Sequence, residues 1–182
     1  MEINEQNNIT LQPHNILYKQ ILSTDLTHEL LDFFAKNSSN LKSMNGSNLF
    51  PQRKQLRNID IELCDRVINE INITMSNYYN NFQIDSNNIR IYYSDFGIVK
   101  PHKDVTIKDK YDSTLLIYLS DNFDGGNITV KIPIEEISKH YYVTPEPRKS
   151  YGILFPKECI HYTDELYNGS KYILLLDCQV DF

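Results

Sequence analysis

The sequence predicts an α+β fold in which helical segments come first and a series of β-strands follows. Apolar residues recur at helical spacing over residues 24–36 and from residue 60 to about residue 82. The C-terminal half instead contains short runs of β-branched and aromatic residues separated by turn-forming sequences. We expect one domain over all 182 residues, with a helical part at about 1–85 and a strand core at about 89–182.

Each predicted helix has one apolar face, which is typical of a helix packed on a sheet. The apolar residues of the first are Leu26, Leu30, Leu31 and Phe34. Those of the second are Ile61, Val67, Ile68, Ile71, Met75 and Tyr78 or Tyr79. Residues 37–48 are rich in Ser, Asn and Gly and are expected to be the loop between the helices. We therefore expect a helical layer that supports one face of a sheet.

Five segments have the composition of strands: residues 89–93, 113–120, 127–132, 151–155 and 171–177. A turn is expected at residues 94–97, after the first of them. A second turn, Asp124-Gly125-Gly126, separates segments 113–120 and 127–132. We expect these two segments to pair in one sheet.

The chemistry-bearing residues of the C-terminal half begin with His102-Lys103-Asp104. Pro101 fixes the backbone before His102, and side chains two positions apart on an extended segment project to the same face. His161 follows the predicted strand 151–155. Two imidazoles and one carboxylate form the facial triad that holds non-heme Fe(II) and leaves coordination positions open. The tripeptide alone is a weak motif, because a surface histidine and a turn-capping aspartate would look the same.

Lys171 adds a second signal, ten residues after His161 and at the start of a predicted strand. Its ammonium group would pair with a carboxylate. The alternative is a solvent-facing lysine after the Asn168-Gly169 turn. Taken with the three candidate ligands, the lysine favours an iron oxygenase that uses an acidic co-substrate.

Residues 92–177 resemble the 2-oxoglutarate- and Fe(II)-dependent dioxygenases, and among them the prolyl 4-hydroxylase-like group. The matching elements stand in family order: Tyr92 or Tyr93, His102-Lys103-Asp104, residues 114–119, Asp124-Gly125-Gly126, residues 152–155, His161 and Gly169-Ser170-Lys171-Tyr172. The resemblance implies a double-stranded β-helix, or jelly roll, from about residue 90 to the end, with the N-terminal helices as support.

The resemblance also implies roles for individual residues and cofactors. His102, Asp104 and His161 match the iron ligands, and Lys171 matches the residue that pairs with the distal carboxylate of 2-oxoglutarate. Tyr118 and Tyr93 are further candidates for binding this co-substrate, although tyrosines that only pack in a core are common. The expected cofactors are Fe(II), 2-oxoglutarate and O2, with L-ascorbate as a further candidate.

The substrate favoured by the resemblance is a prolyl residue in a peptide or protein, because Lys171 has the spacing of the collagen-type prolyl 4-hydroxylases. Residues 45–57 and 134–148 are polar, contain prolines and are expected to form mobile loops at the site mouth. A proline-rich peptide in the polyproline II form would suit a groove lined by tyrosines. Lysyl or asparaginyl residues, nucleobases and small molecules stay as alternative substrates. A catalytically silent binding module of the same fold is a further alternative, which the intact triad disfavours.

Composition excludes several other classes. A net charge of −6 gives no overall attraction to nucleic acid, and the arginine-rich C-terminal signature of nucleic-acid demethylases is absent. Three cysteines without CxxC spacing indicate neither a disulfide framework nor a zinc site. His14, His28 and His140 have no metal-binding partners in the sequence pattern. No signal peptide or membrane span is evident, so we expect a cytoplasmic protein, and the heavy use of Asn, Ile, Lys and Tyr suggests a viral or protist source.

Overall fold

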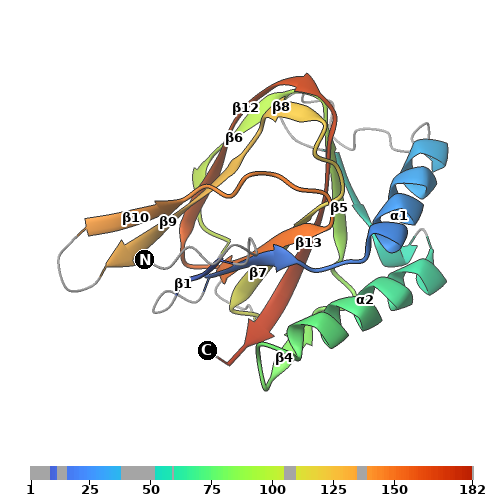
Figure 1. The fold of residues 1–182 in the computed structure, drawn as a ribbon, viewed down its shortest axis with the longest axis horizontal. Helices are drawn as coiled ribbons and strands as arrows, with labels where there is room; N and C mark the ends of the chain where they lie inside the picture. The colour runs from blue at the N-terminus through green and yellow to red at the C-terminus, as the bar shows by residue number, and fades with distance from the viewer. Residues whose placement is uncertain are drawn as a thin grey trace.

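The computed structural model describes residues 9–11, 16–37, 52–58, 60–104, 110–134 and 139–181. Within these ranges the elements are, in chain order, β1 (Ile9–Leu11), β2 (Ile16–Gln20), α1 (Thr24–Asn37), β3 (Gln52–Gln55), a 3-10 turn (Leu56–Asn58), α2 (Ile61–Met75), β4 (Phe82–Ile84), β5 (Arg90–Ser94), β6 (Gly97–His102), β7 (Ser113–Tyr118), β8 (Phe123–Gly125), β9 (Ile128–Ile134), β10 (Lys139–Val143), β11 (Tyr151–Pro156), β12 (Ile160–Gly169) and β13 (Lys171–Val180). The predicted mixture of helices and strands is confirmed (Figure 1).

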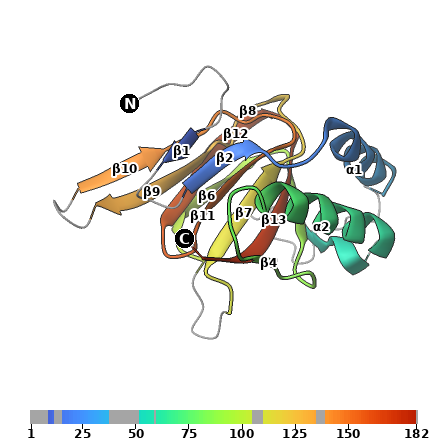
Figure 2. The same ribbon diagram turned by 60° about the horizontal axis from the view of Figure 1, so that its bottom comes forward.

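The strands form two antiparallel sheets. The larger sheet has eight strands in the order β1-β2-β11-β7-β13-β5-β3, with β4 paired to β13. The smaller has five strands in the order β10-β9-β12-β6, with β8 paired to β12. Both helices lie against one side of the larger sheet, as the two views of the ribbon show (Figure 1; Figure 2). The arrangement is consistent with a jelly-roll fold.

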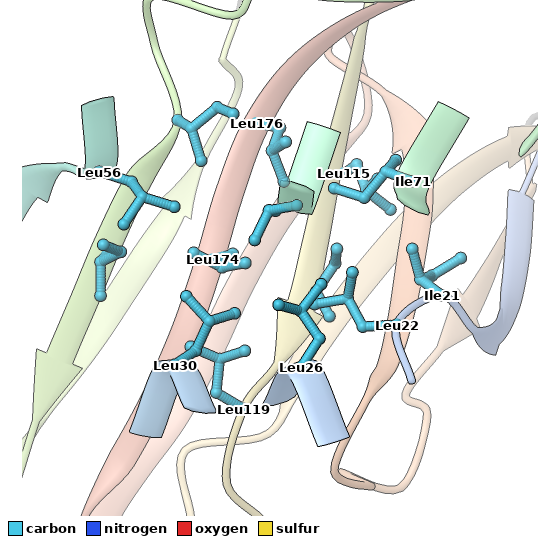
Figure 3. Close-up of a cluster of buried hydrophobic side chains, with 14 of the residues drawn as sticks. Ile21, Leu22, Leu26, Leu30, Leu56, Ile71, Leu115, Leu119, Leu174 and Leu176 are labelled. Atoms are coloured by element: carbon cyan, nitrogen blue, oxygen red, sulfur yellow. The ribbon is translucent and has the colours of Figure 1, made fainter. Parts of the chain in front are cut away.

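Residues along each strand of the larger sheet alternate between two buried clusters. In β7, Leu115 and Ile117 belong to the cluster beneath the helices, whereas Leu116 and Tyr118 belong to a second cluster. Figure 3 shows the first cluster, in which helix and sheet side chains interlock. The second cluster joins residues of both sheets, including Val130 of β9. The interior between the sheets is therefore separate from the core beneath the helices, and the candidate site faces this interior.

The two helices begin at polar caps. The Ser23 hydroxyl accepts a hydrogen bond from the Leu26 backbone, and the Asp60 carboxylate accepts one from the Leu63 backbone at 2.9 Å. The first helix matches its prediction, but the second ends at Met75, before the predicted end near residue 82. The chain turns after Met75 because residues 76–81 are weak helix formers, and residues 82–84 pair with β13.

The predicted pairing of segments 113–120 and 127–132 is wrong. Strand β7 lies between β11 and β13 in the larger sheet, whereas β9 lies between β10 and β12 in the smaller one. Residues 124–126 are therefore not a hairpin turn, and the chain crosses between the sheets there through β8. The sequence pattern identified both strands, but strand partners depend on contacts that are distant in the sequence.

Both segments predicted as mobile loops contain strands. Residues 52–55 form β3, which pairs with β5, and residues 139–143 form β10, which pairs with β9. The remaining parts of these predictions at residues 45–51 and 135–138 lie outside the described residues, as do residues 38–48 of the expected interhelical loop. The N-terminal part is not only helical, since β1 to β4 all join the larger sheet. None of the described helices is long and apolar enough to cross a membrane.

Candidate metal and co-substrate site

The structure brings together the three predicted metal ligands. His102 ends β6 and lies directly opposite His161 of β12, with the ring centroids 4.3 Å apart. Asp104 follows two residues after His102, and its two carboxylate oxygens each lie 3.5 Å from the Nε2 of one histidine. One potential ligand atom from each residue lies within 4.8 Å of the others. Such a cluster suits a single divalent cation.

Both imidazoles are oriented by backbone carbonyls. His102 Nδ1 lies 2.9 Å from the Lys100 carbonyl oxygen, and His161 Nδ1 lies 3.1 Å from that of Cys159. A carbonyl oxygen only accepts hydrogen bonds, so each Nδ1 carries the hydrogen and each Nε2 keeps a lone pair for a metal. Burial lowers the pKa of His161, which favours the neutral imidazole that a metal requires.

Thr114 and Phe155 also contact the triad, and no sequence motif marked either residue as part of the site. The Thr114 hydroxyl donates to Asp104 Oδ2 at 2.8 Å, and the Phe155 ring lies 4.9 Å from that of His161. Thr114 and Phe155 are opposite each other in the β7–β11 pair. Whether these two side chains face the triad depends on the register of the β7–β11 pair. The one sequence signal is that Thr114 lies four residues before Tyr118 on a strand, and therefore on the same face.

Lys171 is buried at the start of β13, with 6% of its surface exposed. Its ammonium donates to the Gly126 carbonyl oxygen and lies 5.7 Å from the centre of the Tyr118 ring. No carboxylate in the described part of the chain forms an ion pair with it. Burial lowers the pKa of Lys171 to about 8, and the charge of Asp164 only partly offsets this effect. The predicted solvent-facing alternative does not apply.

Tyr118 is completely buried beside Lys171, and its hydroxyl has no hydrogen-bond partner within the described ranges. Burial raises its pKa. The Ile128 backbone approaches the hydroxyl closely enough to offset part of that shift, but without normal hydrogen-bond geometry. A buried hydroxyl without a partner is unfavourable, and such groups commonly mark the place of a ligand or water.

The two candidate tyrosines of β5 face opposite ways. Tyr92 is opposite Ile173, which is itself opposite Tyr118, so these three side chains project into the interior between the sheets. Tyr93 is opposite Tyr172, with ring centroids 4.9 Å apart, on the other face of the sheet. The structure therefore places Tyr92, and not Tyr93, on the side of the candidate site.

The remaining histidines and the cysteines lie elsewhere. His28 lies on α1 with its Nε2 3.3 Å from the Lys149 ammonium, and His140 is exposed on β10. His14 is outside the described residues. All three cysteines are buried and free.

No family model matches this sequence, and no curated protein matches it. Solved structures do. A prolyl hydroxylase from Trichoplax adhaerens, in complex with a hypoxia inducible factor oxygen degradation domain peptide fragment, is 16% identical with a TM-score of 0.67 over 93% of this chain and 86% of that one. The viral collagen prolyl hydroxylase of Paramecium Bursaria Chlorella virus-1, in complex with 2OG, is 13% identical with a TM-score of 0.63 over 93% and 98%.

A third similar structure is that of an enzyme with another activity. The non-heme alpha ketoglutarate dependent epimerase SnoN, from nogalamycin biosynthesis, is 11% identical with a TM-score of 0.72 over 92% of this chain and 78% of that one. At identities this low, the TM-scores show that the folds are shared and nothing further. The predicted resemblance is thereby confirmed at the level of structure: the chain has the fold of the prolyl 4-hydroxylase-like 2-oxoglutarate oxygenases.

Proposed function

We propose that the protein is an Fe(II)- and 2-oxoglutarate-dependent dioxygenase that hydroxylates a prolyl residue in a peptide or protein. The observation that carries this proposal is the convergence of His102, Asp104 and His161 with both Nε2 lone pairs available. Lys171 and Tyr118 support it from the same interior. Tyr118 shares a buried cluster with Val130, and Val130 lies opposite His161.

Fe(II) fits the donor set. Two neutral imidazoles and one carboxylate leave three coordination positions for other ligands, and this is the arrangement of non-heme iron oxygenases. The metal would supply the redox chemistry that activates O2. The chain's own contribution is to fix the ligands in orientation, through backbone carbonyls for the imidazoles and through Thr114 for Asp104.

The interior also fits the distal carboxylate of 2-oxoglutarate. An ammonium without an anionic partner and a hydroxyl without a hydrogen bond are both unfavourable when buried. One carboxylate would satisfy both, pairing with Lys171 and accepting a hydrogen bond from Tyr118. Tyr92 replaces Tyr93 as the second tyrosine of this proposal, because it faces the same interior as Tyr118. The proposal also includes a double-stranded β-helix as the arrangement of the strands. L-ascorbate would act as a reductant for the iron.

The prolyl substrate is supported by the two prolyl hydroxylases among the similar structures, one of them solved with a peptide fragment. Exposed tyrosines on β10 at positions 141 and 142 provide aromatic rings on which a proline-rich peptide would pack. The second candidate function is oxidation of a small molecule, which the similarity to the epimerase favours.

The test combines purified protein with Fe(II), 2-oxoglutarate and O2, and offers proline-rich peptides, alkylated single-stranded DNA or a panel of small molecules. Succinate formation coupled to the gain of one oxygen on a peptide, located by mass spectrometry at proline, would support the proposal. Turnover of the DNA or small molecules alone would overturn the prolyl assignment. Asp104→Ala should abolish turnover, whereas His28→Ala, which alters an exposed histidine on α1, should leave it unchanged.

A further inference from the structure

Asp104 is the one candidate ligand that lies outside the paired strands. It follows two residues after His102, the last residue of β6. Both histidines, by contrast, sit within the paired β6 and β12 strands. A carboxylate has two equivalent oxygens and rotates freely unless something holds it. The contacts that hold Asp104 therefore decide which ligand geometry it offers.

Two contacts hold this residue from the larger sheet. Its backbone N–H donates to the Lys157 carbonyl oxygen at 3.1 Å, which fixes the position of the main chain. The Thr114 hydroxyl donates to its Oδ2 at 2.8 Å, which fixes the rotation of the carboxylate. Thr114 is fully buried in the central strand β7, between β11 and β13, so its own position is rigid.

Thr114 in turn lies beside a buried charged residue. It lies opposite Asp177 of β13, whose carboxylate binds the Lys157 ammonium at 2.9 Å and the Arg90 guanidinium at 3.0 Å. Lys157 thus links both routes, because its ammonium binds Asp177 and its carbonyl oxygen binds the Asp104 backbone. The network connects the candidate ligand to three neighbouring elements of the larger sheet.

We propose that Thr114 is a positioning residue for the metal site, which holds the Asp104 carboxylate so that it serves as a one-oxygen ligand. This inference rests on the proposed metal site. A hydroxyl hydrogen bond to Oδ2 competes with two-oxygen binding, which would occupy a fourth coordination position. Three open positions are what a bidentate 2-oxo acid and O2 together require. Thr114 therefore keeps three coordination positions open for the 2-oxo acid and O2, and it also strengthens binding of the metal.

The test measures metal binding without turnover, using Co(II) titration followed by its absorption spectrum and Mn(II) binding followed by electron paramagnetic resonance. Thr114→Val keeps the shape and removes the hydroxyl, and we expect metal affinity to fall about 10- to 100-fold. Thr114→Ser restores the hydroxyl and should bind within a few-fold of the wild type. The Mn(II) spectrum of Thr114→Val should also change in shape, because the carboxylate is free to rotate.

The matched control is Thr129→Val in β9, where the same substitution removes a hydroxyl that bonds to Thr144 at 2.8 Å. Thr129 lies opposite Tyr162, so its side chain projects to the other face of the smaller sheet from His161. Thr129→Val should bind metal like the wild type. Equal affinity and spectra of Thr114→Val and the wild type would overturn the inference, as would equal weakening by Thr129→Val. If the wild type itself binds neither ion, the proposed metal site fails instead. Thr114→Ala replaces Thr114→Val if circular dichroism shows the latter unfolded.

Discussion

The carbonyl oxygen of Gly126 accepts a hydrogen bond from the ammonium group of the buried Lys171. Gly126 has a positive φ of 66°, and a Cβ there would lie 3.4 Å from the Lys171 side chain. The glycine thus lets the backbone approach the lysine closely, and the carbonyl supplies a dipole where a full negative charge is missing. One neutral acceptor compensates an ammonium only in part. The Lys171 ammonium therefore still favours a negatively charged partner.

Removal of the lysine should separate co-substrate binding from metal binding. Lys171→Ala should raise the dissociation constant for 2-oxoglutarate about 10- to 150-fold, because a charge-assisted contact contributes roughly 1.5–3 kcal/mol. Affinity for Co(II) should change little. Lys171→Arg should also bind 2-oxoglutarate poorly, since the planar guanidinium needs a differently shaped pocket. Isothermal titration measures both ligands, and an equal loss of metal binding would contradict this role.

The pH dependence of 2-oxoglutarate binding should report the pKa of Lys171. Burial lowers that pKa from 10.5 to about 8, so the ligand-free protein loses the ammonium charge above about pH 8. Affinity should be constant below this pH and fall up to about tenfold per pH unit above it. Ligand-free stability should change in the opposite sense, rising between pH 8 and 10.5, because the unfolded chain keeps the proton longer. A pH slope that persists in Lys171→Ala would assign it to another group.

Tyr118→Phe should weaken binding without weakening the fold. The hydroxyl has no partner to lose in the described structure, so its removal should leave the free energy of unfolding unchanged or raise it by about 1 kcal/mol. Affinity for 2-oxoglutarate should fall about tenfold. The control is Tyr18→Phe, whose hydroxyl donates to the Glu146 carbonyl oxygen, and this variant should lose about 1 kcal/mol of stability. Urea unfolding distinguishes them, and a clearly destabilised Tyr118→Phe would mean that the hydroxyl has a structural partner.

The clustering of His102, Asp104 and His161 was predictable from residue type and order along the chain. Runs of β-branched, aromatic and other apolar residues also located β5, β7, β9, β11 and β13 within a few residues. Strand partners were not predictable, as the mistaken pairing of segments 113–120 and 127–132 shows. Strand β3 was not predicted because its four residues are all polar. Strand β10 was not predicted because it lies within the proline-containing segment 134–148, which was interpreted as a loop. Both strands lie at sheet edges, where one side needs no partner.

The sequence also did not predict which side chains face the interior between the sheets. Tyr92 and Tyr93 are adjacent and chemically identical, and only the register with β13 decides which one faces the interior. Thr114 is inconspicuous for the same reason, since its contact with Asp104 depends on a strand and a loop ten residues apart. Sequence order thus identified the candidate metal ligands and Lys171, whereas sheet register determined which other side chains lie beside them.

Asp177 carries the last prediction, because its carboxylate binds both the Lys157 ammonium and the Arg90 guanidinium. Asp177→Asn keeps the shape but removes a buried negative charge that two cations bind, which should cost about 3–5 kcal/mol of unfolding free energy. Adding Lys157→Met should recover part of the loss, because it removes one of the two positive charges beside the lost carboxylate. Glu29→Gln, at the exposed Glu29–Arg66 pair, should leave the denaturation midpoint unchanged. Since the Lys157 carbonyl also holds the Asp104 backbone, Asp177→Asn should weaken Co(II) binding under conditions where the variant is still folded. Full stability of Asp177→Asn would show that solvent, and not Asp177, compensates the two cations.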